Sequence, residues 1–271
     1  MPDVEALAGA ASETFVAVDG VRIHCRFDGT VGAPVLVLSN SLGTDLTMWD
    51  GQIAELARTF RVVRYDTRGH GTSTASPGPY SVERLGCDVV GVLDGLGIAN
   101  AHFCGLSLGG ITGIWLGIHA PDRLRRLVLA NTAAQIGPPD NWNARIEKVR
   151  AGGMGAISPA VIDRWFTSAW AASHPDRIAA MRTMLERSPA EGYMACCAAV
   201  RDMDQREAVA DINVPTLVIT GTHDIATPAA DGRVLADRIG GSRYVELDAA
   251  HLSNIEAAPV FTSTLLAFLD N

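Results

Sequence analysis

The chain has 271 residues and a mass of 28.6 kDa, and its 22 basic and 30 acidic side chains give a formal charge of −8. This length fits one large domain, or one domain that carries an inserted subdomain. A hydrophobic content of 48% excludes an intrinsically disordered chain. The acidic balance argues against a protein that binds nucleic acid or an anionic membrane surface, so we expect neither partner.

Five cysteines occur without a CxxC pair or any other metal-ligand spacing, which predicts reduced thiols and no bound metal. The chain starts Met-Pro-Asp-Val-Glu, without the basic region of a secretory signal, and its first dozen residues are interpreted as a loose lead-in. Both features favour a cytoplasmic protein. Residues 101–121 carry no Asp, Glu, Lys or Arg, but their glycines and polar residues indicate a buried strand and helix rather than a membrane span.

Hydrophobic periodicity predicts strands that alternate with helices along most of the chain. Two β-rich runs around Asp19-Gly20 predict an antiparallel hairpin at the start. Ser81 is the expected N-cap of an amphipathic helix over 81–97, and Thr227-Pro228 is expected to open another helix. The remaining predicted strands are 35–39, 61–65, 101–105, 127–130, 216–220 and 244–247, and the remaining predicted helices are 111–118 and 260–269.

Residues 134–205 interrupt this alternation with helix-like segments that hold three of the five tryptophans. The pattern therefore predicts an α/β fold with a mostly parallel eight-stranded sheet flanked by helices on both faces. We assign residues 1–133 and 206–271 to this core domain. Residues 134–205 are interpreted as a helical cap subdomain inserted over one end of the sheet.

The sequence Gly105-Leu106-Ser107-Leu108-Gly109 matches G-x-S-x-G between a predicted strand and a predicted helix. In this context a tight turn projects the serine at the carboxyl end of the strand, and the residues two positions away must be small. We therefore predict that Ser107 is a nucleophile rather than part of a structural glycine turn. The backbone N–H of Leu108, at the start of the helix, is a predicted oxyanion donor.

His251 follows the last predicted strand and is the predicted general base for the serine. Asp224 directly follows strand 216–220 and is the acid expected to orient His251. His70 and His223 also lie in predicted loops, but residue order along the chain disfavours them as the base. The other common position for the acid, after strand 127–130, holds Asn131, which has no carboxylate.

A second oxyanion donor is expected after strand 35–39, where the sequence reads Ser39-Asn40-Ser41-Leu42-Gly43. By position, this donor is the backbone N–H of Leu42. Residues 65–73 form a glycine-punctuated segment that matches neither the P-loop nor the dinucleotide-binding motif. We interpret this segment as a structural turn near the rim of the site rather than as a phosphate-binding loop.

The elbow at Ser107, the order Ser107, Asp224, His251 and the inserted cap together resemble the α/β-hydrolase superfamily over essentially the whole chain. Several segments are more specific and look like those of 3-oxoadipate enol-lactonases, which act in aromatic catabolism. These segments are 39–45 with Met48-Trp49, 131–134, 192–193 with 196–199, Arg201-Asp202 and 248–256. Asn40-Ser41 departs from the His-Gly of many α/β-hydrolases, and Gln135 stands where many enol-lactonases are expected to have a basic residue.

The resemblance implies hydrolysis of 3-oxoadipate enol-lactone to 3-oxoadipate through an acyl-enzyme on Ser107, without a metal or cofactor. Because this lactone carries a free carboxylate, a cation is expected to hold it. The candidates are Arg201 in the cap, Arg68 in the glycine-punctuated segment and Arg145, while Gln135 leaves the anchor unassigned. Trp142 is a candidate for an apolar wall of the substrate site.

Two other classes of function fit the same residues. One is another capped serine hydrolase, such as a carboxylesterase, a carbon–carbon bond hydrolase or a perhydrolase. The other is a ligand receptor that keeps the hydrolase scaffold without its activity, because a fold does not fix a function. Residues 134–205 hold eight basic and eight acidic side chains, so the −8 belongs to the core and an anionic substrate requires local cations. The oligomeric state is not predicted by the sequence.

Overall fold

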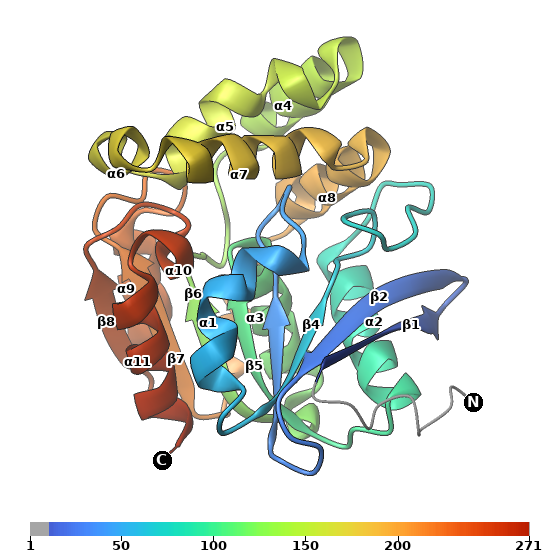
Figure 1. Cartoon of the computed structure of the whole chain (residues 1–271), viewed down its shortest axis with the longest axis vertical. Coiled ribbons are helices and arrows are strands. Elements are labelled where there is room, and N and C mark those ends of the chain that lie inside the picture. Colours follow the sequence, from blue (N-terminus) through green and yellow to red (C-terminus); the bar gives the residue numbers. More distant parts are fainter. Residues whose placement is uncertain (1–10, 271) are drawn as a thin grey trace.

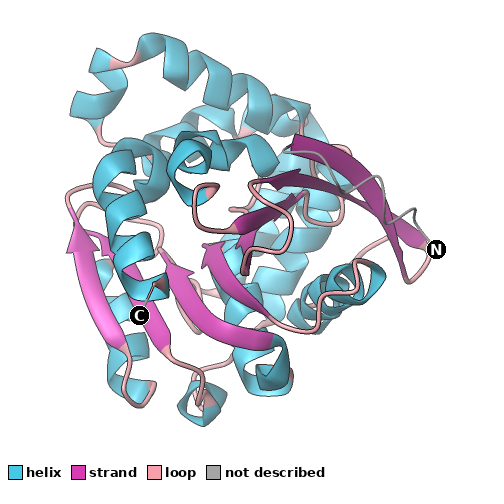
Figure 2. Ribbon diagram, turned by 60° about the horizontal axis from the view of Figure 1, so that its bottom comes forward, coloured by secondary structure: helices cyan, strands magenta, loops and turns pink. Residues whose placement is uncertain are grey.

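An eight-stranded sheet runs through the centre of the molecule, as predicted, with helices on both of its faces (Figure 1). The computed structural model describes residues 11–270, so most of the predicted lead-in lies outside the described residues. The strand order is β1-β2-β4-β3-β5-β6-β7-β8. β2 pairs antiparallel with β1 and β4, and all other neighbours are parallel. Figure 2 shows the twist of this sheet between its helices.

The strands fall where the hydrophobic runs predicted them, with ends that differ by a few residues. Strands 35–39 and 61–65 match the prediction at both ends, and the Asp19-Gly20 turn joins the first two strands. The strands are β1 (Ala11–Val18), β2 (Val21–Asp28), β3 (Val35–Ser39), β4 (Arg61–Tyr65), β5 (Ala101–Leu106), β6 (Leu124–Ala130), β7 (Thr216–Gly221) and β8 (Arg243–Leu247).

The helices of the core domain cover both faces of the sheet. Ser81 caps α2 as predicted, because its hydroxyl accepts the Arg84 N–H at 3.1 Å. A short helix after β3 has no counterpart in the sequence prediction, and it packs beside the last helix of the chain. The core helices are α1 (Asp50–Leu56), α2 (Val82–Gly95), α3 (Leu108–His119), α9 (Ala229–Arg238), α10 (Ser253–Glu256) and α11 (Ala258–Leu269).

Side chains of the central strands alternate between two hydrophobic clusters, one on each face of the sheet. In β3, Leu36 and Leu38 join the cluster that includes α1 and α11, whereas Val37 joins the cluster of α2 and α3. Both faces are buried because helices cover both, which explains why the strand sequences are continuous apolar runs. The carboxyl ends of the parallel strands are left open for a site.

Five helices between β6 and β7 lie over the carboxyl ends of the parallel strands, in the segment predicted to be a cap (Figure 1). They are α4 (Pro139–Gly152), α5 (Ser158–Trp165), α6 (Ser168–Ser173), α7 (Pro175–Arg187) and α8 (Ala190–Asp202). The domain boundaries stay a prediction, but residues 134–205 are called the cap below. No helix among the described residues is long and apolar enough to cross a membrane.

The cap touches the core through a close backbone contact between Gly69 and Gly192. A Cβ atom added at Gly192 would lie 2.1 Å from the carbonyl oxygen of Gly69. A Cβ atom added at Gly69 would lie 2.6 Å from Cα of Gly192. Only glycine at both positions allows α8 to approach the glycine-punctuated segment this closely.

We expect Gly192→Ala to lower the free energy of unfolding by about 1–3 kcal/mol, because the new methyl group overlaps backbone that cannot move aside. Urea denaturation monitored by tryptophan fluorescence measures this loss. Gly155→Ala is the matched control, because no atom lies within 4 Å of the added Cβ. Equal stability of the two variants would contradict the contact.

Candidate active site

Ser107 lies between β5 and α3, on a strained turn. Its backbone has φ 58° and ψ −109°, and its N–H donates to the Ala130 carbonyl at 2.9 Å. A Cβ atom added at Gly105 would lie 2.0 Å from the Gly109 carbonyl oxygen. The turn therefore excludes a side chain at Gly105, two residues before the serine, as the motif predicted. An unusual backbone conformation of this kind is found at functional sites.

His251 and Asp224 meet at the ends of two neighbouring strands. Asp224 follows β7, His251 follows β8, and Nδ1 of His251 lies 2.8 Å from Oδ2 of Asp224. The other carboxylate oxygen of Asp224 accepts the N–H groups of Ala226 at 2.8 Å and Thr227 at 3.0 Å. Nε2 of His251 has no hydrogen-bond partner among the described residues, and His251 lines the same cavity as Ser107.

The surroundings of Asp224 favour its ionised form. Burial raises the pKa of this carboxyl, but the charge of His251 and the hydrogen bonds from His251, Thr227 and Asn131 outweigh it and hold the pKa below its ordinary value. An ionised Asp224 fixes the hydrogen of His251 on Nδ1 and stabilises the imidazolium that forms when Nε2 takes a proton.

Asn131 contributes to the site although it cannot supply a carboxylate. It follows β6 in a left-handed conformation with φ 45°, and its amide nitrogen donates to Oδ2 of Asp224 at 3.0 Å. Its amide oxygen accepts the Ser253 hydroxyl at 2.5 Å. From the sequence, position 131 is notable only for lacking a carboxylate, whereas in the structure its side chain contacts the carboxylate of Asp224.

A cavity of about 500 Å³ lies between the cap and the carboxyl ends of the strands. Ser107 and His251 line it from the core, together with Leu42 and Leu108. Its volume falls in the usual range for a site that takes a small molecule. The apolar part of the lining includes Ile111, Ile136, Trp142, Val161, Trp165 and Val200.

The two predicted oxyanion donors border this cavity. The N–H groups of Leu42 and Leu108 donate to no protein acceptor among the described residues. Asn40, which replaces the more common histidine, is fully buried and holds the preceding backbone, with its amide donating to the Tyr65 carbonyl at 2.8 Å. The Gly109 N–H donates to the Asn40 carbonyl at 3.0 Å, so the segment that carries one donor is bonded to the helix that carries the other.

Three cap cations line the cavity: Arg145 and Lys148 on α4, and Arg164 on α5. None of the three forms an ion pair with a carboxylate among residues 11–270. The Arg145 guanidinium lies 4.7 Å from the ring centroid of Trp142. Burial, and after it the charge of Arg145, lower the pKa of the Arg164 guanidinium, so an anion between them would relieve both costs.

The structure does not bring the other predicted anion contacts to the cavity. Arg201 is engaged by both oxygens of Asp202, at 2.6 and 2.7 Å, and by Asn143 at 3.0 Å. Arg68 is buried against Asp88, with Nε 2.7 Å from a carboxylate oxygen. The Gln135 side chain is exposed. None of the three lines the cavity, whereas Trp142 does, so the structure argues against Arg201, Arg68 and Gln135 as substrate contacts.

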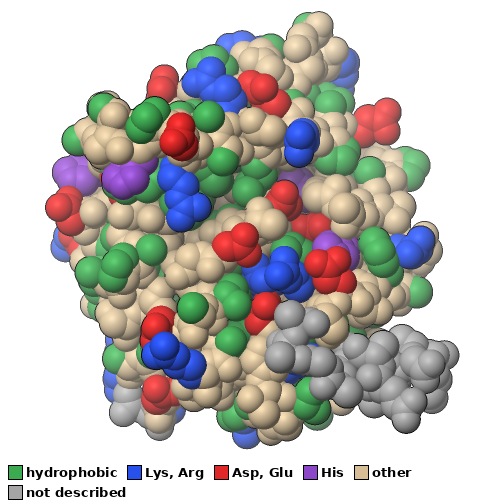
Figure 3. All heavy atoms as spheres, in the orientation of Figure 1, with side chains coloured by type: hydrophobic (Ala, Val, Ile, Leu, Met, Phe, Trp, Pro, Cys, Tyr) green, Lys and Arg blue, Asp and Glu red, His purple; other side chains and the backbone are tan. Residues whose placement is uncertain are grey.

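On the face seen in Figure 3, acidic and basic side chains are interspersed over the cap and the core. No broad patch of one sign appears there, which agrees with the equal numbers of basic and acidic residues in the cap. Within residues 11–270, no cluster of three or more His, Cys, Asp or Glu side chains is arranged to hold a metal ion.

We expect Asp224→Asn to lower kcat by about four orders of magnitude, because an amide leaves the hydrogen of His251 on the wrong nitrogen. A second change, Asn131→Asp, should restore part of this loss. The side chain at position 131 already reaches within 3.0 Å of the Asp224 oxygen that holds His251. Ester or lactone turnover measures both effects. A double variant no faster than Asp224→Asn would show that only the β7 position can serve His251.

Comparison with known proteins places the chain in a family. Residues 34–154 match the family model described as "alpha/beta hydrolase fold". The chain is 41% identical to 3-oxoadipate enol-lactonase 2 of Acinetobacter baylyi over 257 residues, which cover 95% of this chain and 96% of that protein.

Solved structures agree with this result. The enol-lactonase from Burkholderia xenovorans LB400 is 50% identical, with a TM-score of 0.94 over 95% of this chain and all of that chain. A thermophilic esterase from Thermogutta terrifontis is 29% identical, with a TM-score of 0.87 over 96% of this chain and 98% of that chain. The chain therefore belongs to the 3-oxoadipate enol-lactonase family of α/β-hydrolases, as its sequence resemblance predicted.

Proposed function

We propose that this protein hydrolyses 3-oxoadipate enol-lactone to 3-oxoadipate through an acyl-enzyme on Ser107. The observation that carries the proposal is one cavity that joins Ser107 and His251 to three cap cations, none of which is paired with a carboxylate among the described residues. A serine nucleophile with its base opens esters and lactones of many kinds. The cations favour an anionic acyl compound among them, and the relatives named enol-lactonases support a lactone of this class.

In the first half of the reaction, Oγ of Ser107 attacks the lactone carbonyl while Nε2 of His251 takes its proton. The N–H groups of Leu42 and Leu108 hold the oxyanion of the tetrahedral intermediate. The ring C–O bond then breaks and the enolate leaves, taking the proton back from His251. The enol that results changes to the ketone, which prevents the ring from closing again.

In the second half, water attacks the acyl-enzyme and gives its proton to Nε2 of His251. The ester bond to Ser107 breaks, and the proton returns to Oγ. Asp224 stays ionised throughout, because its hydrogen bonds and the imidazolium charge favour the carboxylate. The chemistry uses only side chains and backbone amides of this chain, so no step depends on a metal or cofactor.

The substrate carboxylate is assigned to Arg145, Lys148 and Arg164. The core carries all of the −8 charge, so the protein as a whole repels an anion. The three cations face the cavity without a carboxylate partner among the described residues, and they project from the cap. A carboxylate between them would form charge-assisted hydrogen bonds while the lactone carbonyl lies at Ser107.

The direct test generates the enol-lactone in situ and follows the loss of its ultraviolet absorbance. We expect the protein to accelerate hydrolysis strongly, and Ser107→Ala to lower kcat by about four orders of magnitude or more, because no nucleophile remains. Melting temperatures of both proteins check that the variant is folded. A folded Ser107→Ala enzyme with wild-type turnover would remove Ser107 from the mechanism.

Other outcomes of this test separate the competing functions. An enzyme that turns over simple esters but leaves the enol-lactone at its spontaneous rate is another capped serine hydrolase. A protein that binds the lactone without turnover is a receptor on the same scaffold. Either outcome would overturn the proposal.

A second prediction concerns the cations. We expect the double variant Arg145→Gln with Lys148→Gln to lower kcat/KM for the enol-lactone at least about tenfold, because each charged hydrogen bond contributes roughly 1.5–3 kcal/mol. α-Angelica lactone has the same ring with a methyl group in place of the carboxymethyl group, so its kcat/KM should change little.

Arg201→Gln is the matched control for this prediction, because it removes a cap charge that lies outside the cavity. It should leave the turnover of both lactones near the wild-type value. If Arg201→Gln affected the anionic lactone as much as the double variant does, the assignment to the cavity cations would be wrong.

A further inference from the structure

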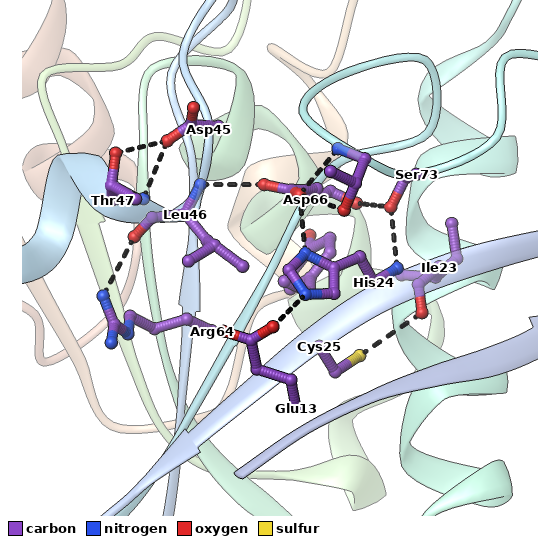
Figure 4. A network of polar contacts seen from close by, with 12 residues as sticks. Glu13, Ile23, His24, Cys25, Asp45, Leu46, Thr47, Arg64, Asp66 and Ser73 are labelled. Atoms are coloured by element: carbon purple, nitrogen blue, oxygen red, sulfur yellow. Dashed lines mark hydrogen bonds and ion pairs between the residues drawn. The ribbon is translucent and has the colours of Figure 1, made fainter. Parts of the chain in front are cut away.

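Asp66 bonds the glycine-punctuated segment 65–73 to the chain that follows β3 and also closes the segment on itself. Oδ1 of Asp66 accepts the Leu46 N–H at 2.9 Å, and Oδ2 accepts the Thr72 N–H at 3.0 Å. Figure 4 shows this carboxylate between the two segments, with Nδ1 of His24 also 2.9 Å away. The cap also contacts this segment, through Gly192 against Gly69. A side chain in the segment is therefore held in a fixed position between the cap and the core.

His70 occupies that place and makes a bond to the oxyanion segment. It is fully buried, and its Nε2 accepts the Gly43 N–H at 3.0 Å. Nδ1 lies 3.4 Å from the Arg68 carbonyl, which agrees with a hydrogen on Nδ1. Burial lowers the pKa of His70 to about 4, against the opposing effects of the Arg68 carbonyl and the Asp66 charge. The ring is therefore neutral near pH 7, and Nε2 remains an acceptor.

The two peptide groups that flank Leu42 are each anchored by a hydrogen bond. The Ser41 carbonyl accepts the Thr44 N–H at 3.2 Å and the Thr44 hydroxyl at 2.8 Å. Because a trans peptide is planar, the Leu42 N–H points the opposite way from that carbonyl. On the other side of Leu42, the Gly43 N–H is held by His70. The direction of the Leu42 N–H is thus set by its neighbours.

The cap holds the same residue from its other end. The hydroxyl of Ser188, between α7 and α8, donates to the Gly43 carbonyl at 3.1 Å. Gly43 has φ 84°, and an added Cβ would lie 2.6 Å from Cδ1 of Leu185. Gly43 is therefore tied to the core through its N–H and to the cap through its carbonyl.

We propose that His70 is a positioning residue for acyl transfer, which anchors the Gly43 amide and thereby keeps the Leu42 N–H aimed at the oxyanion. His70 does not line the cavity and acts only through Gly43. The proposal rests on the serine acyl-transfer mechanism of the proposed function, but it does not depend on which lactone or ester is the substrate.

The test compares His70→Leu, which removes the acceptor, with His70→Gln, whose amide oxygen can replace Nε2. We expect His70→Leu to lower kcat about tenfold to a hundredfold, somewhat less than the full loss of an oxyanion donor, with KM changed less than about twofold. His70→Gln should recover most of the rate. Turnover of both the enol-lactone and p-nitrophenyl acetate should fall by the same factor, because both form the same oxyanion.

Phenylboronic acid gives a readout that does not require turnover. It adds to a serine Oγ as a tetrahedral adduct whose oxygen takes the oxyanion position. We expect the dissociation constant of the boronate to rise in His70→Leu by about the factor by which kcat falls. This comparison remains valid if the enol-lactone proves not to be a substrate, so the two proposals fail separately.

His102→Leu is the matched control, because His102 is also a buried histidine with a pKa lowered to about 4, at the opposite end of β5 from Ser107. It should leave kcat and boronate affinity unchanged. A folded His70→Leu enzyme with wild-type kcat and boronate affinity overturns the proposal. So does a loss in His70→Gln that equals the loss in His70→Leu.

If His70→Leu does not fold, Ser188→Ala tests the same anchored residue from the cap. Removal of one hydroxyl leaves the cavity and the triad intact, and we expect kcat and boronate affinity to fall by the same factor of a few. Unchanged values in Ser188→Ala, together with a His70→Gln enzyme that loses the rate, would overturn the proposal.

Discussion

A backbone hydrogen bond beyond the ends of β3 and β5 joins the two halves of the proposed catalytic apparatus. The Gly109 N–H, in the first turn of α3, donates to the Asn40 carbonyl at the end of β3. This bond requires the two backbones to approach so closely that a Cβ at Gly109 would lie 2.3 Å from the Ser39 carbonyl oxygen. The strained turn at Ser107, its neighbouring glycines and the buried Asn40 all serve this approach. The proposed nucleophile and both proposed oxyanion donors therefore share one rigid frame. Catalysis by fixed dipoles needs such a frame, because dipoles that must reorganise during the reaction stabilise the transition state less.

In the proposed mechanism, the charge distribution separates recognition from chemistry. The core holds the proposed nucleophile, base and acid, and it also holds the whole net charge of −8. The cap is neutral overall, yet it directs three cations into the cavity while Arg201 is neutralised by Asp202. The net charge of the protein is therefore a poor guide to the charge of its ligand. The affinity of an anion in a partly enclosed cavity depends mainly on nearby charges and their desolvation, because salt screens the distant charges. Separate elements carry the two tasks, so the cap can change its ligand without disturbing the triad.

Sequence patterns predicted the sheet closely because its strands are continuous apolar runs bounded by turns. Ser107, Asp224 and His251 followed from their places at strand ends, since parallel strands bring those ends to one edge. The cations that face the cavity were harder to predict. Arg145 and Arg201 both lie on cap helices, and only the packing of α4 against α8 decides that one faces the cavity and the other solvent. Helix α1 escaped prediction because it is short, and Asn131 because its bond to Asp224 joins residues far apart in the chain.

The glycine-punctuated segment illustrates why a residue can be dismissed for one role and still matter for another. Chain order disfavours His70 as the base, and burial keeps it neutral, which would be a defect in a proton carrier. The same burial suits a fixed acceptor, because a neutral imidazole presents a lone pair whose direction the surrounding packing sets. The structure requires glycine on both sides of His70. Gly69 allows the cap to approach at Gly192, and a Cβ atom added at Gly71 would lie 2.2 Å from Cγ of Asp66. This contact region connects the docking of the cap to the oxyanion segment. The packing of the cap on the core therefore influences the position of the proposed oxyanion donors through hydrogen bonds of ordinary length.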